Sequence, residues 1–174
     1  ENFNEYIISK LSKMDSNLEN LIIAKNDTEN SLLWNIRESI PIAEKKHGVI
    51  VKHDISIPLE NMDNFIENTE KKLFSFKSLE IINFGHIGDN NLHFNVCLNS
   101  NLSVKEKTKI AKKINQIIFS NVEKFGGSIS AEHGIGQLRK KELKRFKTGY
   151  EYKQMKSIKK IFDPHNIFNP GKVF

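Results

Sequence analysis

The chain has 174 residues, of which 38% are hydrophobic and 28% charged, and 27 basic against 21 acidic side chains give a formal net charge of +6 at pH 7. This length and composition predict one globular domain, with at most an extra terminal arm. No apolar run approaches the roughly 20 residues needed to cross a bilayer, and no signal peptide is visible. The single cysteine, Cys97, excludes an internal disulfide and fits a reducing compartment.

The positive charge is carried mainly by lysines. They are spread along helix-like stretches, as in residues 105–113, and no aromatic side chains are interleaved with them as on a nucleic-acid-binding platform. We therefore interpret them as a solvated face and expect no nucleic-acid partner.

The first 48 residues predict mainly helix. Residues 3–14 place apolar side chains at helical spacing, and residues 31–38 predict a second helix that Pro41 bends or restarts. Between them, residues 21–24 form a short apolar run that is typical of a buried strand. Gly48 is expected to end the turn that follows the second helix.

The next segment alternates as a strand over residues 49–57. Lys52, Asp54 and Ser56 are predicted on one side, and Val51, His53 and Ile55 on the other. Pro58 then opens an amphipathic helix that carries Leu59, Met62, Phe65, Ile66 and Leu73.

The remaining elements are a hairpin and two helices. Residues 79–84 and 92–97 predict paired strands around a loop, and Ser103 with Glu106 forms a capping box for a long helix that ends at Gly126. A last helix is predicted over residues 150–162. This mixture predicts an α+β fold, an antiparallel sheet covered by helices.

Two histidines of the hairpin are the first candidates for chemistry. His86 lies where the first strand enters the loop, and His93 lies on the second strand, on the same face as Asn95. Two converging imidazoles suit Zn²⁺ or a similar divalent metal, but they need a third ligand. Without a metal, they would be a hydrogen-bonded hairpin pair. Asp89 is interpreted as a turn residue.

The third ligand is sought in the glycine-rich segment 126–136. Glu132 and His133 are adjacent there, and in an extended segment one would face the metal while the other faces the substrate. Together with His86 and His93, these two residues favour a metal site over a hairpin pair without a metal. The segment follows a helix and does not match the dinucleotide-binding fingerprint, which argues against a nicotinamide cofactor.

Arg37 and Lys52 permit two interpretations. Together they could clamp a carboxylate, with Arg37 bidentate and Lys52 as a point charge. Spacing alone favours the simpler interpretation, in which Arg37 is a surface cation whose stem covers apolar area.

Several segments, in the order in which they occur, resemble the C-terminal domain of the FAD-linked oxidase family, which includes D-lactate dehydrogenases, the glycolate oxidase flavin subunit and D-2-hydroxyglutarate dehydrogenases. The matching segments are Leu33-Trp34-x-x-Arg37-Glu38, Val51-Lys52-His53-Asp54-Ile55-Ser56-Ile57-Pro58, His86-x-Gly88-Asp89-x-Asn91-Leu92-His93, Gly127 to Gly136, and Phe162-Asp163-Pro164 through Asn169-Pro170-Gly171-Lys172.

The resemblance implies a ferredoxin-like substrate domain over residues 1–174, without the family's N-terminal FAD-binding domain. It implies a metal, with Zn²⁺ expected, on His86, His93 and Glu132, and a proton acceptor at His133. It also implies the following contacts: substrate at Arg37, Lys52 and Asn95, and the flavin at Asn169. It raises the carboxylate clamp above the surface-cation interpretation. The chain departs from the family at two positions: Asn90 and Ala131 stand where family members usually have glycine.

The expected reaction is oxidation of a 2-hydroxy acid of the D-lactate, glycolate or D-2-hydroxyglutarate type to the 2-oxo acid, with hydride transfer to FAD. The expected partners are that small molecule and the FAD-binding domain of the same polypeptide, and a homodimer is also considered. The expected location is the cytoplasm or the periphery of the inner membrane. The alternative is a metal- or ligand-binding module without chemistry, or a subunit of a separate flavoprotein.

Overall fold

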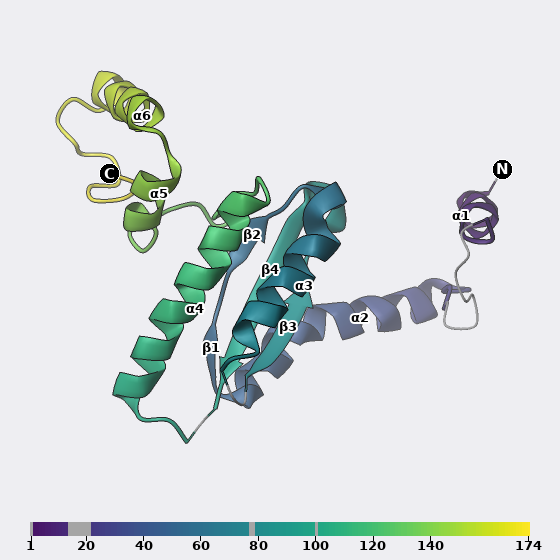
Figure 1. Cartoon of the computed structure of the whole chain (residues 1–174). Helices are drawn as coiled ribbons and strands as arrows, with labels where there is room; N and C mark the ends of the chain where they lie inside the picture. The colour runs from purple at the N-terminus through teal and green to yellow at the C-terminus, as the bar shows by residue number, and fades with distance from the viewer. Residues whose placement is uncertain (1, 14–21, 77–78, 100) are drawn as a thin grey trace. The chain divides into compact units, whose positions relative to one another are not determined.

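The computed structural model describes residues 2–13, 22–76, 79–99 and 101–174 (Figure 1). The chain divides into two compact units, Glu1–Ala43 and Glu44–Phe174. Within the described residues, no helix has both the length and the apolar character that crossing a membrane requires.

The first unit holds two helices, α1 (Phe3–Leu11) and α2 (Asp27–Ala43). Both were predicted, although Met14 at the end of the first prediction lies outside the described residues. α2 begins earlier than predicted, because the side chain of Asn26 accepts a hydrogen bond from the backbone N–H of Glu29 at 2.9 Å and thereby caps the helix.

Two details of the first unit differ from the sequence analysis. α2 continues through Pro41, where a bend or a restart was predicted. The second unit begins with the 3₁₀ turn η2 (Glu44–His47), and Gly48 follows its end as predicted, with a φ of 108°. The strand predicted over residues 21–24 is wrong for the described part, since residues 22–24 have no regular structure and Ile22 is exposed. An apolar run without a neighbouring strand has nothing to pair with.

A four-stranded antiparallel sheet forms the centre of the second unit. The strands are β1 (Val49–Val51), β2 (Asp54–Ser56), β3 (Glu80–Phe84) and β4 (Asn91–Leu98). β4 is central: β1 and β2 pair with it on one side and β3 on the other. The strand predicted over residues 49–57 is thus divided in two, but its register continues, because Val51 pairs with Val96 and Asp54 with His93.

Two helices cover one face of this sheet, α3 (Met62–Leu73) and α4 (Val104–Lys124) (Figure 1). α3 follows the 3₁₀ turn η3 (Leu59–Asn61) that Pro58 precedes. The capping box of Ser103 and Glu106 is confirmed at the start of α4, and Gly126, with a φ of 71°, follows its end. An isolated bridge between Ser56 and Ser128 then brings the chain back beside β2. This order confirms the ferredoxin-like α+β fold.

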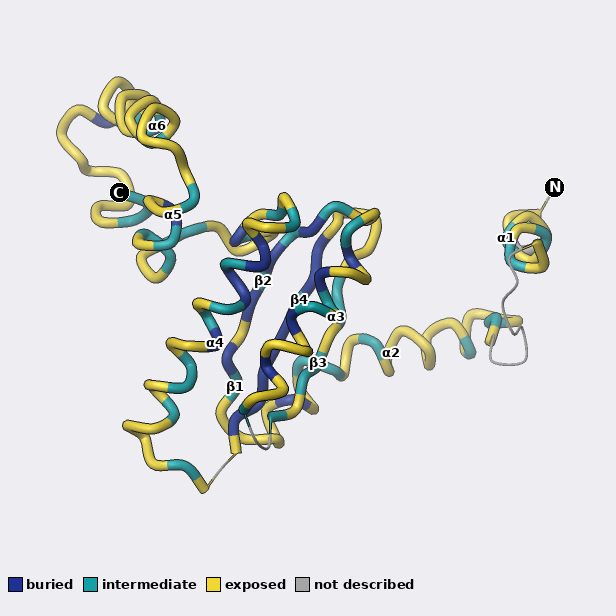
Figure 2. Tube along the Cα trace, viewed as in Figure 1, coloured by how far each residue is buried: buried dark blue, intermediate teal, exposed yellow. Residues whose placement is uncertain are grey.

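The central strand separates an apolar face from a polar one. Leu92, Phe94, Val96 and Leu98 belong to the buried core with the inner sides of α3 and α4 (Figure 2). Phe94 packs edge-on against Phe65 of α3, with ring centroids 5.8 Å apart. The alternate positions of β4 are Asn91, His93, Asn95 and Cys97. The alternation therefore presents three polar side chains, Asn91, His93 and Asn95, on the face that the two helices leave uncovered.

The chain closes with two further helices, α5 (Lys140–Phe146) and α6 (Gly149–Phe162). α6 confirms the last predicted helix and has its own capping box between Thr148 and Glu151. α5 was not predicted, because Leu143 is its only buried residue and leaves no apolar stripe to detect. The C-terminal segment then bonds back to the glycine-rich loop, where the N–H of Val173 donates to the carbonyl of Gly136 at 2.8 Å.

Candidate metal and catalytic site

The hairpin that carries the two histidines is closed by a tight turn. β3 leads through Gly85 and His86 into the 3₁₀ turn η4 (Ile87–Asp89), and Asn90 takes the left-handed conformation expected of it, with a φ of 55°. A Cβ atom on Gly85 would lie 2.3 Å from the carbonyl oxygen of Asn91, so only glycine permits this close approach. The backbone N–H of His86 donates to Oδ1 of Asn91 at 3.1 Å, which holds the turn together.

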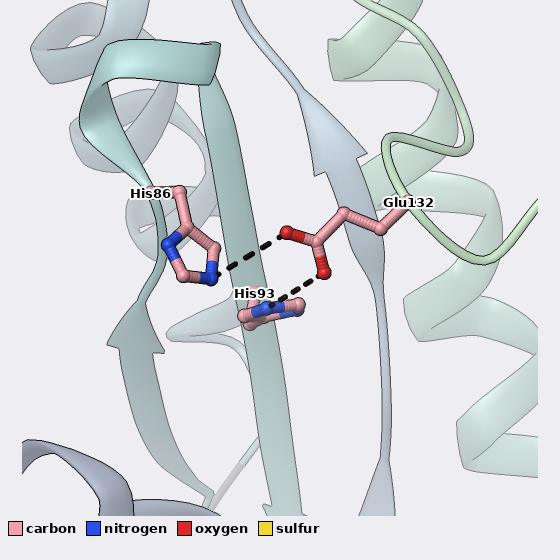
Figure 3. Close-up of side chains that lie close together, drawn as sticks. All are labelled: His86, His93 and Glu132. Atoms are coloured by element: carbon pink, nitrogen blue, oxygen red, sulfur yellow. Dashed lines mark ion pairs between the residues drawn. The ribbon is translucent and has the colours of Figure 1, made fainter.

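The structure brings the three predicted metal ligands together. His86 and His93 come from the hairpin and Glu132 from the loop after α4, and one ligand atom of each lies within 4.8 Å of the others (Figure 3). Nε2 of His86 is 3.5 Å from Oε1 of Glu132, and Nε2 of His93 is 3.9 Å from Oε2. The two carboxylate oxygens therefore face one imidazole each.

This donor set fits a divalent cation. Two imidazole nitrogens and one carboxylate are a typical ligand set of a catalytic zinc site, in which the fourth position stays open. Burial lowers the pKa of His93 below its ordinary value, although the nearby carboxylates of Asp54 and Glu132 oppose the shift. The lowered pKa favours the neutral form of the imidazole, which is the form that binds a metal.

The sequence suggested an extended loop around Glu132, but the structure shows a bent one. The backbone N–H groups of Glu132 and His133 both donate to Oδ2 of Asp54, at 2.8 Å each, so consecutive amides converge on one oxygen. Positive φ angles occur at Gly134 and Gly136, while Ala131 is not among the described residues with positive φ. Alanine in place of the family's usual glycine is therefore tolerated at Ala131.

His133 lies beside the three ligands without belonging to them. Its ring stacks on that of His93, with centroids 6.0 Å apart and an interplanar angle of 25°. Nδ1 of His133 is 3.5 Å from Oδ2 of Asp54, and 71% of the side chain is exposed. This imidazole therefore has one nitrogen directed at a carboxylate and an open approach for a proton-donating molecule.

Asp54 connects the residues of the site, although the sequence had suggested no role for it. Its side chain is only 8% exposed and accepts hydrogen bonds from Glu132, His133 and the side-chain amide of Asn91. Burial alone would raise the pKa of this carboxyl, but the backbone N–H groups of His133 and Glu132 lower it below its ordinary value. Its predicted place on the same side as Lys52 was the available signal.

Lys52 and Asn95 meet at a buried carboxylate that the sequence analysis also missed. Glu44 has a fully buried side chain, which forms an ion pair with the half-exposed ammonium of Lys52. Oε2 of Glu44 accepts a hydrogen bond from Nδ2 of Asn95 at 2.7 Å, and Oδ1 of Asn95 accepts the backbone N–H of His53 at 3.3 Å. The side chains of Lys52 and Asn95, the two predicted substrate contacts, thus share Glu44 as a common partner.

Comparison with known proteins identifies the family of the chain. Residues 5–173 match the family described as FAD linked oxidases, C-terminal domain. The chain belongs to this family. Its relatives include proteins named D-2-hydroxyglutarate dehydrogenase from Xanthomonas citri pv. viticola, 34% identical over 154 residues, and from Stutzerimonas stutzeri, 33% identical over 154 residues. The mitochondrial protein of that name from Arabidopsis thaliana is 34% identical over 152 residues.

The chain of this FAD-linked oxidase domain spans about a third or less of the length of these relatives. The matches cover 88% of the chain and 32% of the Xanthomonas protein, 88% and 33% for Stutzerimonas, and 87% and 26% for Arabidopsis. The relatives therefore contain much sequence that has no counterpart in these 174 residues.

For two predicted site residues of the FAD-linked oxidase domain, Arg37 and Asn169, the described contacts include none with the metal ligands. Arg37 lies on α2, in the other unit of the chain. Asn169 lies in the exposed C-terminal segment with a φ of 46°, and its carbonyl accepts the N–H of Lys172 at 3.1 Å. Both assignments remain predictions.

Proposed function

We propose that this domain carries the metal- and substrate-binding half of a flavin-dependent dehydrogenase that oxidises a 2-hydroxy acid to the 2-oxo acid. The observation that supports this most strongly is the convergence of His86, His93 and Glu132 beside the separate imidazole of His133, in a member of the FAD-linked oxidase family. The names of the relatives favour D-2-hydroxyglutarate within this substrate class.

Three side chains are suited to hold the cation, with Zn²⁺ as the first choice for two histidines and a carboxylate. When bound, the cation supplies Lewis-acid polarisation of substrate oxygens, and FAD accepts a hydride. FAD itself would be held mainly by a domain outside these residues, with Asn169 proposed to lie near it.

His133 is proposed to accept the proton of the substrate hydroxyl. In the overall change the O–H proton moves to an imidazole nitrogen and the hydrogen on Cα leaves with its electron pair to the flavin, so that the C–O single bond becomes a carbonyl. An imidazole suits this role because its ordinary pKa lies close to neutral pH. Its exposure leaves room for a substrate.

Lys52 is proposed to bind a substrate carboxylate, together with Asn95. A contact between Arg37 and the substrate remains a prediction. The ammonium of Lys52 has three donors, and Glu44 engages it from the buried side. A half-exposed ammonium on the same sheet face as His93 is suited to fix the orientation of an anionic substrate. A homodimer and a location in the cytoplasm or at the inner membrane remain predictions.

The test uses the complete polypeptide with its FAD, freed of oxygen and mixed with D-2-hydroxyglutarate, D-lactate or glycolate in a stopped-flow spectrometer. We expect bleaching of the flavin by at least one of these acids, formation of the 2-oxo acid, and loss of both after removal of divalent metal with a chelator. Metal binding without flavin reduction by any 2-hydroxy acid would favour the module that does no chemistry.

A further inference from the structure

We propose that Asp54 is a positioning residue whose single carboxylate fixes both the metal ligands and the proton-accepting histidine. This inference rests on the function proposed above and adds a residue to it. Asp54 lies on β2, between the hairpin that carries His86 and His93 and the loop that carries Glu132 and His133.

The first set of contacts holds the loop. Oδ2 of Asp54 accepts the backbone N–H groups of Glu132 and His133 at 2.8 Å each, and the backbone carbonyl of Asp54 accepts the N–H of Ala131 at 3.2 Å. Three consecutive amides are thus bound by one residue of β2. Because the loop has no helix or strand of its own here, these bonds determine where the carboxylate of Glu132 lies.

The second set of contacts holds the hairpin. Oδ1 of Asp54 accepts Nδ2 of Asn91 at 2.9 Å, and Oδ1 of Asn91 in turn accepts the backbone N–H of His86 at 3.1 Å. Asp54 and Asn91 therefore form a continuous chain of hydrogen bonds from the loop of Glu132 to the backbone of His86. The two segments that supply metal ligands are connected through this chain.

The third set of contacts orients two imidazoles. Nδ1 of His93 lies 3.6 Å from Oδ1 of Asp54, and Nδ1 of His133 lies 3.5 Å from Oδ2. A carboxylate in this position favours the tautomer that is protonated on Nδ1. Nε2 of His93 is then left for a metal, on the side of Glu132, and Nε2 of His133 is left to accept a proton.

Asparagine at residue 54 cannot reproduce these contacts. Every group that faces the carboxylate at hydrogen-bonding distance is a donor, on both oxygens. An amide has only one acceptor oxygen, and its NH₂ group would face another N–H. Asp54→Asn therefore keeps size and shape but loses the hydrogen bonds of one of the two carboxylate oxygens.

The experiment compares Asp54→Asn with Asp63→Asn, a matched change at an exposed aspartate in the first turn of α3. Zn²⁺ is titrated into each protein by calorimetry after metal removal, and the fold is checked by circular dichroism. We expect Asp54→Asn to bind Zn²⁺ about 10- to 100-fold more weakly and Asp63→Asn to match the wild type. Equal affinity of a folded Asp54→Asn would overturn the proposal, whereas absence of Zn²⁺ binding by the wild type would instead contradict the metal site itself.

A second readout does not depend on the variant folding. ¹⁵N shifts of the imidazoles in the metal-free wild-type chain at pH 8, where histidine is neutral, report which nitrogen carries the proton. We expect His93 and His133 both to be protonated on Nδ1. Finding both protonated on Nε2 would overturn the proposal whatever Asp54→Asn does.

Discussion

Nε2 of His86 and Oε1 of Glu132 lie 3.5 Å apart, although the whole of α4 separates them in the chain. The hairpin and the loop meet because both are bonded to β2. Asn91 of the hairpin bonds to Asp54, and Ser128 and residues 131–133 bond to β2 from the other side. The ferredoxin-like order of strands therefore creates the site, since it places the return of the chain after α4 next to the strand that the hairpin flanks.

Replacing His133 with alanine should lower the rate of flavin reduction by a 2-hydroxy acid in the complete polypeptide by at least about 100-fold. A positioned general base contributes this much or more to the rate. Metal content should not change, because His133 is not one of the three ligands. Stopped-flow kinetics and metal analysis check the two statements. His47→Ala, at an exposed histidine paired with Glu80, is the control and should reduce flavin at the wild-type rate. Unchanged reduction by His133→Ala would remove the role assigned to it.

The stability of the fold should fall as the pH decreases from about 6.5 to about 4. Burial lowers the pKa of His53 from 6.5 to about 4, so between these values the unfolded chain takes up a proton that the folded chain does not. Stability is therefore complete above pH 6.5, and this group removes up to about 3 kcal/mol by pH 4. Asp54, whose pKa is lowered, adds a loss in the same direction below its ordinary value of 3.8.

Urea unfolding of the wild type and of His53→Gln at pH 7, 6, 5 and 4.5 checks the role of His53. The variant should be less stable at pH 7 and should show a shallower decrease with falling pH. Parallel pH profiles for the two proteins would show that His53 is not the group responsible.

Gly85→Ala should loosen the metal hairpin. The added Cβ would lie 2.3 Å from a backbone oxygen, so the strands must move apart beside His86. We expect a loss of about 1–3 kcal/mol in the free energy of unfolding and weaker Zn²⁺ binding. Gly88→Ala in the same turn is the control, because its Cβ would meet nothing within 4 Å. Calorimetric titration and urea unfolding measure both effects, and a Gly85→Ala protein as stable as Gly88→Ala would contradict this account of the turn.

The ion pair of Lys52 and Glu44 should contribute to stability as a coupled unit. Lys52→Met leaves Asn95 as the one partner of the buried Glu44 carboxylate among the described contacts, and we expect it to lower the free energy of unfolding by about 2 kcal/mol. Glu44→Gln should lower the free energy of unfolding less in the Lys52→Met protein than in the wild type. A double-mutant cycle of urea unfolding measures this difference. Lys71→Met, at an exposed pair with Glu67, should change stability by less than about 0.5 kcal/mol. Additive effects of the two changes would exclude the coupling.

The sequence predicted those elements whose signals are local. The capping box of Ser103 and Glu106, the apolar stripe of α4 and the hairpin around Asn90 each depend on residues a few positions apart, and all three are found in the structure. The strand predicted over residues 21–24 does not form in the described part, residues 22–24, because a strand needs a partner that no local pattern reveals.

The site was predicted in part for the same reason. The ligand types and the glycines around them identified His86, His93 and Glu132, and the structure brings them together. The roles of Asp54 and Glu44 depend on contacts with residues far along the chain, at His133 and Asn95, and a single acidic residue in a strand or turn carries no sign of such partners. Only the three-dimensional arrangement exposes them.

The account depends most directly on a cation held by His86, His93 and Glu132. The measurement is the zinc content of the purified protein after Zn²⁺ loading and dialysis, by mass spectrometry, in the wild type and in a His86→Ala/His93→Ala/Glu132→Ala variant. We predict close to one Zn²⁺ per wild-type chain and none in a folded triple variant. Equal zinc in the two proteins, or none in the wild type, would contradict the central claim.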